Sequence, residues 1–157
     1  MRSKGTRPHQ PLDDVSKAII SQLQQDGRRS YAAIGKVVGL SEAAVRQRVQ
    51  RLTDSGVMQV VAVTDPMELG FARQAMVGVR VTGSIEPVAD AIAALDEVDY
   101  VVVTAGSYDL LAEVVAESDE HLLEIISDHI RSIDGVLSTE TFMYLHLRKQ
   151  TYSWGVR

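Results

Sequence analysis

The stretch LDDVSKAIISQLQQDGRRSYAAIGKVVGLSEAAVRQRVQRLTDSGVMQ, residues 12–59, contains three short segments whose apolar residues recur every three or four positions. Such spacing places the apolar side chains on one face of a helix, so each segment is predicted to be an amphipathic helix. Only three residues separate the second segment from the third, which is the outline of a helix-turn-helix. The helices are predicted over residues 12–25, 31–37 and 42–54, and Val38, Gly39 and Leu40 are the three residues between the second helix and the N-cap of the third.

The ends of these segments carry the residue types that helix ends prefer. Asp13 and Asp14 suit the positive end of the first helix dipole. Ser30 and Ser41 are preferred N-cap residues for the second and third helices. The β-branched run that follows, residues 57–63, is predicted to form a strand.

The outward face of the third predicted helix consists mainly of arginine and glutamine. Removing its apolar stripe of Val45, Val49 and Leu52 leaves guanidinium and amide groups and no lysine. Arginine binds guanine in a bidentate manner, glutamine binds adenine, and arginine also neutralises phosphates. A solvated helix on a bundle is the alternative interpretation. The candidate contacts to double-stranded DNA are Arg28, Ser41, Glu42, Ala44, Arg46, Gln47, Arg48, Gln50 and Arg51.

Charge is unevenly distributed along the chain. The 157 residues have a net charge of −5. Residues 1–64 hold ten lysines and arginines against five acids, whereas residues 65–157 hold six against sixteen. This asymmetry predicts two modules, the first of which faces a polyanion.

The second half alternates between strand and helix patterns and contains an internal repeat, because residues 92–98 match residues 130–136 at an offset of 38 positions. Two copies of strand–helix–strand give a βαββαβ domain, the ferredoxin-like arrangement. Two helices would cover one face of its sheet, and the other face is expected to carry apolar side chains from all four strands. Since monomers rarely leave so large an apolar surface exposed, we expect the sheets of two copies to pair. The strands are predicted over residues 74–82, 100–104, 110–116 and 137–147.

Residues 12–59 closely resemble the winged helix-turn-helix of the Lrp/AsnC (feast/famine) transcription regulators, without a gap. Two positions depart from the family pattern: Ser16 stands where an acid is usual, and Gly35 replaces a common alanine. We expect Gly35 to cost its helix about 1 kcal/mol relative to alanine. The residues that carry the resemblance are Leu12, Asp13, Ile19, Leu23, Asp26, Gly27, Arg28, Leu40, Ser41, Val45, Arg48, Val49, Leu52, Gly56 and Val57.

Residues 104–114 and 133–147 resemble the effector-sensing and oligomerisation domain of the same family. In that family a Gly-x-Tyr/Phe-Asp turn lies beside a small-molecule site between dimers, often for an amino acid, and Gly106, Tyr108 and Asp109 match this turn. Glycine permits a positive φ, and an aspartate can accept from an ammonium group. A plain hairpin turn with an Asx interaction is the alternative. The candidate effector-binding residues are Thr104, Gly106, Ser107, Tyr108, Asp109, Thr139 and Glu140.

Other chemistries find little support in the sequence. The chain has no cysteine, which excludes disulfides and thiolate metal sites, and it has no glycine-rich phosphate loop or Gly-x-Ser-x-Gly motif. His121 lies near Glu120 and Glu124, but a solvated acidic helix explains this group, so we expect neither a metal site nor a cofactor. No apolar run could span a membrane, and the N-terminus lacks the apolar region of a secretory signal. A cytoplasmic, nucleoid-associated protein that is not an enzyme is expected.

Taken together, these patterns predict an α+β protein, with an N-terminal winged helix-turn-helix joined by a hinge to a C-terminal ferredoxin-like domain. The predicted function is sequence-specific transcriptional regulation, in which a small-molecule effector, an amino acid, modulates DNA binding or assembly. The alternatives are an architectural DNA-binding protein with little sequence preference and no effector, and a ferredoxin-like hydrolase fused to a DNA module. The expected assembly is a homodimer that forms a tetramer or an octamer of dimers. The expected segments are a flexible basic tail (1–11), the DNA-binding domain (12–63), the hinge (64–72), the sensing domain (73–149) and a C-terminal tail (150–157).

Overall fold

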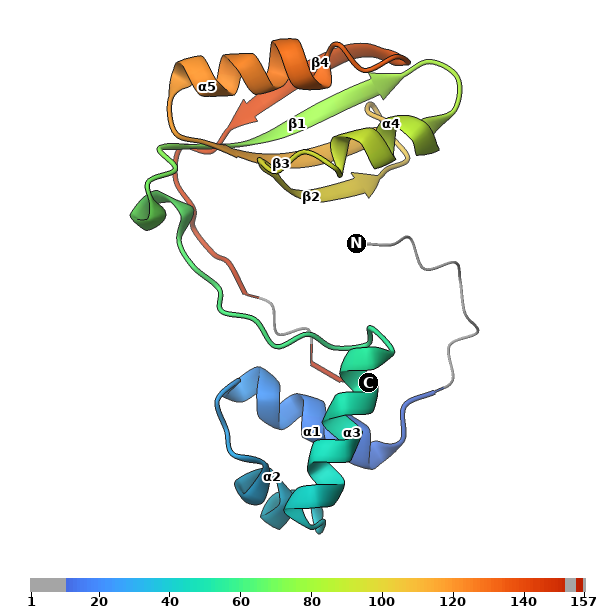
Figure 1. Ribbon diagram of the computed structural model, residues 1–157, viewed down its shortest axis with the longest axis vertical. Helices are drawn as coiled ribbons and strands as arrows, with labels where there is room; N and C mark the ends of the chain where they lie inside the picture. The colour runs from blue at the N-terminus through green and yellow to red at the C-terminus, as the bar shows by residue number, and fades with distance from the viewer. Residues whose placement is uncertain (1–10, 152–154, 157) are drawn as a thin grey trace. The chain divides into compact units, whose positions relative to one another are not determined.

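The computed structural model describes residues 11–151, 155 and 156, and the chain divides into two compact units (Figure 1). The first unit comprises the chain up to Ala62 together with the C-terminal segment from Gln150, and the second spans Val63–Lys149. Most of the predicted basic tail, residues 1–10, lies outside the described residues, as does part of the predicted C-terminal tail. No helix in the described part of the chain is long and apolar enough to cross a membrane.

Three helices make up the first unit: α1 (Asp14–Gln25), α2 (Tyr31–Val38) and α3 (Glu42–Asp54). Each begins after a residue whose side-chain oxygen accepts a hydrogen bond from the first turn of the helix. The three caps are Asp13, Ser30 and Ser41. The apolar faces meet in one buried core, formed by Ile19, Leu23, Ile34, Val45 and Val49. The helices predicted from the sequence are therefore confirmed.

Residues 57–63 do not form the predicted strand. None of them belongs to a strand in the structure, and the side chains of Val60, Val61 and Val63 are more than half exposed. β-branched residues favour a strand only where a neighbouring strand and a packing surface are present. Only Met58 of this segment packs against the helical core, and no strand among the described residues pairs with the segment, so the unit as described has no strand in the position of a wing.

Gly35 lies where helix α2 approaches the turn that leads into α3. The backbone N–H of Leu40 donates to the carbonyl oxygen of Gly35 at 3.0 Å. A Cβ built on Gly35 would lie 2.4 Å from the carbonyl oxygen of Leu40. This contact is with backbone, which cannot rotate away as a side chain can. Close packing therefore explains the glycine. Helix propensity alone had predicted only that Gly35 destabilises its helix relative to alanine.

We expect the substitution Gly35→Ala to lower the free energy of unfolding of the first unit by about 1–3 kcal/mol, because the added methyl group overpacks the turn. Helix propensity alone predicts the opposite sign, a gain of about 1 kcal/mol. Chemical denaturation of the full chain, followed by far-ultraviolet circular dichroism, measures this difference. A more stable Gly35→Ala variant would show that the turn moves aside without cost.

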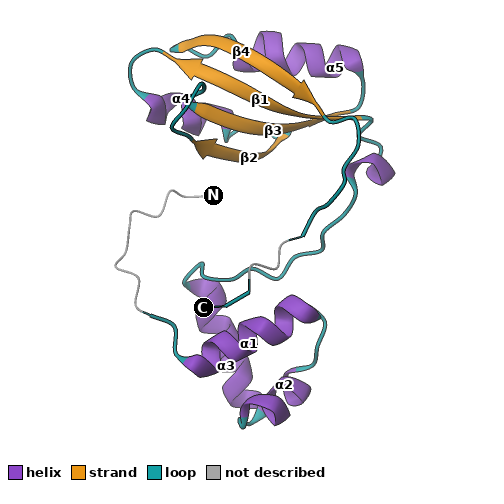
Figure 2. Cartoon of the chain, turned by 180° about the vertical axis from the view of Figure 1, so that it is seen from behind, coloured by secondary structure: helices purple, strands orange, loops and turns teal. Residues whose placement is uncertain are grey.

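The second unit is a four-stranded antiparallel sheet in the order β2-β3-β1-β4. Helices α4 (Ile85–Ile92) and α5 (Asp119–Glu124) lie on the same face of this sheet (Figure 2). Between the sheet and the helices lies the larger core, in which Val77, Val79, Leu110, Ile92 and Ile125 are fully buried. The predicted βαββαβ arrangement is thus confirmed. The strands are β1 (Arg73–Val81), β2 (Val98–Val103), β3 (Leu110–Ala116) and β4 (Val136–Met143).

Several element boundaries differ from those predicted. β4 ends at Met143 rather than at residue 147, and Met143 lies opposite Ala75, near the start of its partner strand β1. The second long helix of the repeat changes character, since α5 continues as a π-helical turn, η2 (Ile125–Ile130). A short 3₁₀ turn, η1 (Pro66–Leu69), occupies the segment predicted as the hinge.

The sheet face opposite the helices, which we call the open face, carries both apolar and polar side chains. Apolar residues such as Leu111 and Phe142 share this face with charged and amide groups. Glu113, for example, lies opposite Met76 in the register, so both side chains are on the open face. The side chain of Gln74 donates to Glu113 at 2.9 Å. The expectation that all four strands contribute apolar side chains is met, by Met76, Val102, Leu111 and Phe142, although charged and amide side chains share the face. On β1 the open face carries Gln74, Met76, Gly78 and Arg80, which alternate with the buried residues of the strand.

Candidate functional site

The outward face of α3 presents two side chains that no other group restrains. Within the described residues, neither Gln47 nor Arg51 has a hydrogen-bonding or ionic partner, and both are exposed. Gln50 is exposed as well, but its amide donates to Asp54 at 2.8 Å. Because they are exposed and keep their donors available, Gln47 and Arg51 are the most accessible polar groups on this face.

At the N-terminal end of α3, the candidate residues interact with one another or with the helix. The hydroxyl of Ser41 accepts from the backbone N–H of Ala44 at 3.3 Å, so it serves as the helix cap. Glu42 forms an ion pair with Arg46 at 2.8 Å. Arg28 lies apart from α3, in the turn between α1 and α2, and is exposed.

Arg48 faces the interior of the unit and links α3 to the start of α1. Its guanidinium donates to Asp13 at 2.7 Å and to the hydroxyl of Ser16 at 3.1 Å. The Arg48 side chain is only 27% exposed. The sequence suggested a DNA contact at this position, but the structure assigns the guanidinium to a contact between helices. This contact also explains Ser16, which supplies an acceptor for Arg48 where the family pattern has an acid.

Hydrogen bonds from Ser16, and then from Arg48, hold the pKa of the Asp13 carboxyl well below its usual value of 3.8. A carboxyl group whose pKa is lowered by folding stabilises the folded state at any pH above its unfolded pKa. This contribution is lost as the pH falls below about 3.8 toward the lower folded pKa.

We therefore expect Asp13→Asn to lower the melting temperature at pH 7 and to have a progressively smaller effect as the pH falls below about 4. Thermal unfolding of the wild type and the variant between pH 3 and pH 7 measures the difference. Asp14→Asn is the matched control, because it removes the same charge one residue away. A difference that stays constant down to pH 3 would contradict a charge-dependent contact.

The turn between β2 and β3 is fixed by its own side chains. The hydroxyl of Thr104 donates to the carbonyl oxygen of Tyr108 at 2.6 Å. The carboxylate of Asp109 accepts from the backbone N–H of Val81 at 2.8 Å, beside the irregularity in the register between β1 and β4. Asp109 therefore satisfies a backbone donor through Oδ2, and its role as an acceptor for an ammonium group stays a prediction. Gly106 is exposed and does not have a positive φ, so that expectation is wrong.

Tyr108 lies flat on the open face instead of projecting beyond the sheet. A Cβ built on Gly78 would lie 2.8–2.9 Å from three atoms of the Tyr108 ring, so only glycine leaves room for it. The ring meets Phe142 edge to face at 5.9 Å, and its hydroxyl donates to the carboxylate of Glu140. The guanidinium carbon of Arg80 lies 5.8 Å from the ring centroid. Tyr108 thus lies between a cation and an anion.

The structure separates the remaining candidates. Thr139 lies opposite Val79 in the register and faces the helices, away from Tyr108 and Glu140. Ser107 is exposed in the turn. Gly78 and Arg80 are not among the effector-binding residues predicted from the sequence, although a glycine inside a strand is a known sign that another group approaches closely.

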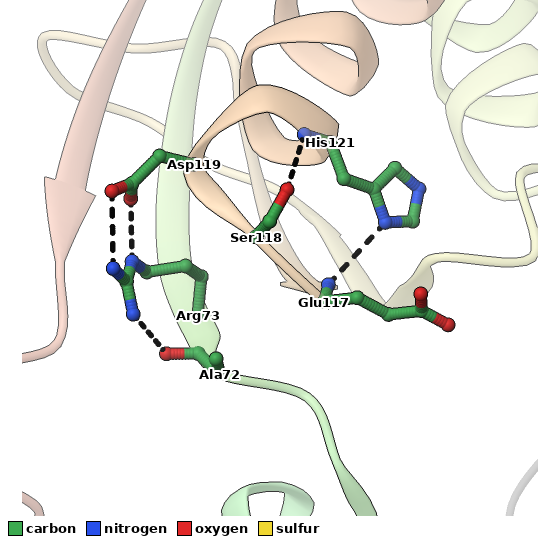
Figure 3. Close-up of polar contacts among 6 residues, drawn as sticks. All are labelled: Ala72, Arg73, Glu117, Ser118, Asp119 and His121. Atoms are coloured by element: carbon green, nitrogen blue, oxygen red, sulfur yellow. Dashed lines mark hydrogen bonds and ion pairs between the residues drawn. The ribbon is translucent and has the colours of Figure 1, made fainter.

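Side-chain hydrogen bonds connect the elements at the junction between β3 and α5 (Figure 3). Arg73 and Asp119 form a two-fold hydrogen-bonded ion pair, and the third nitrogen of the Arg73 guanidinium donates to the carbonyl oxygen of Ala72. Nδ1 of His121 accepts from the backbone N–H of Glu117 at 3.3 Å. The described residues contain no group of acids and histidines that could hold a metal ion.

Two family models match the chain. The AsnC-type helix-turn-helix domain matches residues 12–53, and the Lrp/AsnC ligand binding domain matches residues 74–154. The chain is 36% identical over 143 residues to the HTH-type transcriptional regulator FL11 of Pyrococcus horikoshii. That alignment covers 90% of this chain and 94% of the relative.

Solved structures share the same arrangement of elements. The leucine response regulatory protein LrpA of Mycobacterium tuberculosis matches with a TM-score of 0.80 and 26% identity, over 88% of this chain and 96% of that one. A transcriptional regulator of Neisseria meningitidis, solved as a complex with L-Met, matches with a TM-score of 0.77 and 24% identity. That match covers 91% of this chain and 96% of the other. This chain belongs to the Lrp/AsnC family, whose members are DNA-binding transcriptional regulators and not enzymes.

Proposed function

We propose that the chain binds specific DNA sequences through α3, with Arg46, Gln47 and Arg51 as the principal contacts. The observation that carries this proposal is the free, exposed pair of Gln47 and Arg51 on the outer face of α3. Both side chains keep all their donors available for base edges or phosphates. Arg28 can add a phosphate contact from the turn before α2. Arg48 is assigned to the fold, because its guanidinium already has two partners.

Selection of duplexes from random-sequence DNA by the full chain tests this proposal. A sequence-specific regulator should enrich one motif and bind it roughly 10³-fold or more tightly than a scrambled duplex of equal length. A pseudo-palindromic motif, with half-sites about one helical turn apart, is expected if two α3 helices act together. A small ratio and no enriched motif would instead favour the architectural alternative, in which the chain coats DNA with little preference.

The effector proposed for the second unit is a free amino acid, which binds beside the turn at residues 104–109. Arg80 and Glu140 support this assignment, because they flank Tyr108 on the open face with opposite charges. A zwitterion requires a donor for its carboxylate and an acceptor for its ammonium group, and these two side chains provide both. The Neisseria meningitidis regulator in complex with L-Met adds support from a protein of the same fold.

Calorimetric titration of the twenty amino acids into the full chain tests the effector proposal. We expect at least one to bind the wild type, and Glu140→Gln and Arg80→Gln to weaken it. The control variant Glu120→Gln removes an acid from α5 and should bind as the wild type does. Equal affinity in Glu140→Gln would place the site elsewhere. No binding of any amino acid to the wild type would favour a different metabolite or a regulator without an effector.

The proposed form of the protein is a homodimer joined through the open face, which assembles further into a tetramer or an octamer of dimers. The apolar side chains on that face, Leu111 and Phe142 among them, support self-association. An effector changes DNA binding only if it binds one assembly state more tightly than another. We place this activity in the cytoplasm, on the nucleoid, where the DNA is.

A further inference from the structure

Arg46 on α3 is held by two neighbours, and one of them belongs to α2. Oε1 of Glu42, one helical turn earlier, lies 2.8 Å from Nη2 of Arg46. The guanidinium carbon of Arg46 also lies 5.3 Å from the ring centroid of Tyr31. The Arg46 side chain nevertheless remains 64% exposed, so it is fixed in direction and still open to solvent.

Tyr31 is itself fixed by the fold. It is the first residue of α2, directly after the N-cap Ser30, and it packs against the buried core of the first unit. The ring orientation is therefore set by α2 and the core rather than by solvent. A guanidinium above an aromatic face is attracted to the electrons of the ring, and at a partly exposed site this attraction is modest but directional.

We infer that Tyr31 is a positioning residue for DNA recognition, whose ring holds the Arg46 guanidinium in the orientation in which it meets a base. This inference rests on the proposal that α3 reads the DNA. A long side chain loses freedom when it binds, and a side chain that is already ordered loses less. A planar guanidinium group held in one orientation also favours the two paired acceptors of guanine. A phosphate accepts hydrogen bonds from many directions and gains less from this orientation.

Arg46 differs from Gln47 and Arg51 in having partners that fix its side chain. Gln47 and Arg51 have no partner among the described residues, so they must be ordered when DNA binds. Arg46 is ordered beforehand, by a side chain that is not expected to touch the DNA. Removing the Tyr31 ring should therefore weaken the contribution of Arg46 and leave those of Gln47 and Arg51 unchanged.

A double-mutant cycle in the full chain tests the inference, with a duplex selected by the wild type as the probe. Tyr31→Leu removes the aromatic face and keeps an apolar side chain on the core, whereas Tyr31→Phe keeps the ring. Both are measured in the wild-type background and in Arg46→Met. We expect Tyr31→Leu to weaken binding by about 2- to 10-fold, the range expected when one side chain loses its prior order. Tyr31→Phe should bind within about 2-fold of the wild type.

Two further readouts separate positioning from simple support of the fold. In Arg46→Met, Tyr31→Leu should cause no further loss of affinity, although it should still lower the melting temperature, because Tyr31 also packs against the core of the first unit. Repeating the selection with Tyr31→Leu should relax the sequence preference at one position in each half-site.

Equal losses of affinity in both backgrounds, or an equal loss in Tyr31→Phe, would overturn the inference. If Arg46→Met binds the duplex as the wild type does, the reading role of Arg46 fails and the inference fails with it. If Arg46→Met binds weakly while Tyr31→Leu binds normally, only the inference about Tyr31 is overturned.

Discussion

Replacing Arg46 and Arg51 together by alanine is expected to weaken binding to a selected duplex by about 30-fold or more. Each arginine that contacts a base contributes roughly 1–3 kcal/mol to specific binding, and the two lie more than one helical turn apart on α3. A fluorescence anisotropy titration with labelled duplex measures the loss. The salt dependence of the affinity gives a second result, because each phosphate contact removed lowers the slope by about one.

The matched control for this experiment removes two arginines from the other unit. Arg131 and Arg148 are both exposed there, so the variant Arg131→Ala, Arg148→Ala changes the net charge of the chain by the same amount. It should bind the duplex nearly as tightly as the wild type. If the Arg46→Ala, Arg51→Ala variant bound as the control does, α3 would not be the helix that reads DNA.

A carboxylate placed on the open face is expected to abolish self-association at micromolar concentration. In Leu111→Glu the new charge lies between β2 and β1, at the centre of the surface proposed to pair. An unpaired charge buried at an interface costs about 3–5 kcal/mol, which corresponds to a rise of about two to four orders of magnitude in the dimer dissociation constant. The monomer should stay folded, because this side chain faces solvent when the sheets are apart.

Analytical ultracentrifugation measures this change, and Leu123→Glu is its control. Leu123 is 65% exposed on α5, so the same substitution there adds a charge to a surface that is not proposed to pair. The control should sediment as the wild type does. A wild-type chain that is monomeric at micromolar concentration would contradict the proposed role of the open face directly.

Local periodicity was sufficient to predict the elements whose stabilising contacts are close in sequence. The helices of the first unit follow from their apolar stripes and from caps such as Ser30 and Ser41, which act within a few residues. The strand prediction at 57–63 failed because a strand depends on a partner, and β-branched residues alone do not supply one. The internal repeat predicted the sheet correctly, since both copies find their partners within the unit.

Side-chain roles that depend on distant partners could not be predicted in this way. Arg48 looked like a DNA contact because its partner Asp13 lies 35 residues away. Asp109 looked free because the backbone N–H that it accepts from belongs to Val81, on another strand. Gly78 inside β1 was a sign that another group approaches closely, but the sequence did not identify the Tyr108 ring as that group.

The inward and outward faces of α3 are expected to tolerate substitution differently as such regulators diverge. The contact of Arg48 with α1 lies on the face of α3 toward the core, whereas the side chains of Gln47 and Arg51 are exposed and form no hydrogen bond or ion pair with the described residues. Substitutions at Gln47 and Arg51 can therefore change the preferred operator without reducing the stability of the module. A duplicated gene could acquire new targets by these two positions alone, and a designer who wishes to redirect the protein should randomise them first and leave Arg48 unchanged.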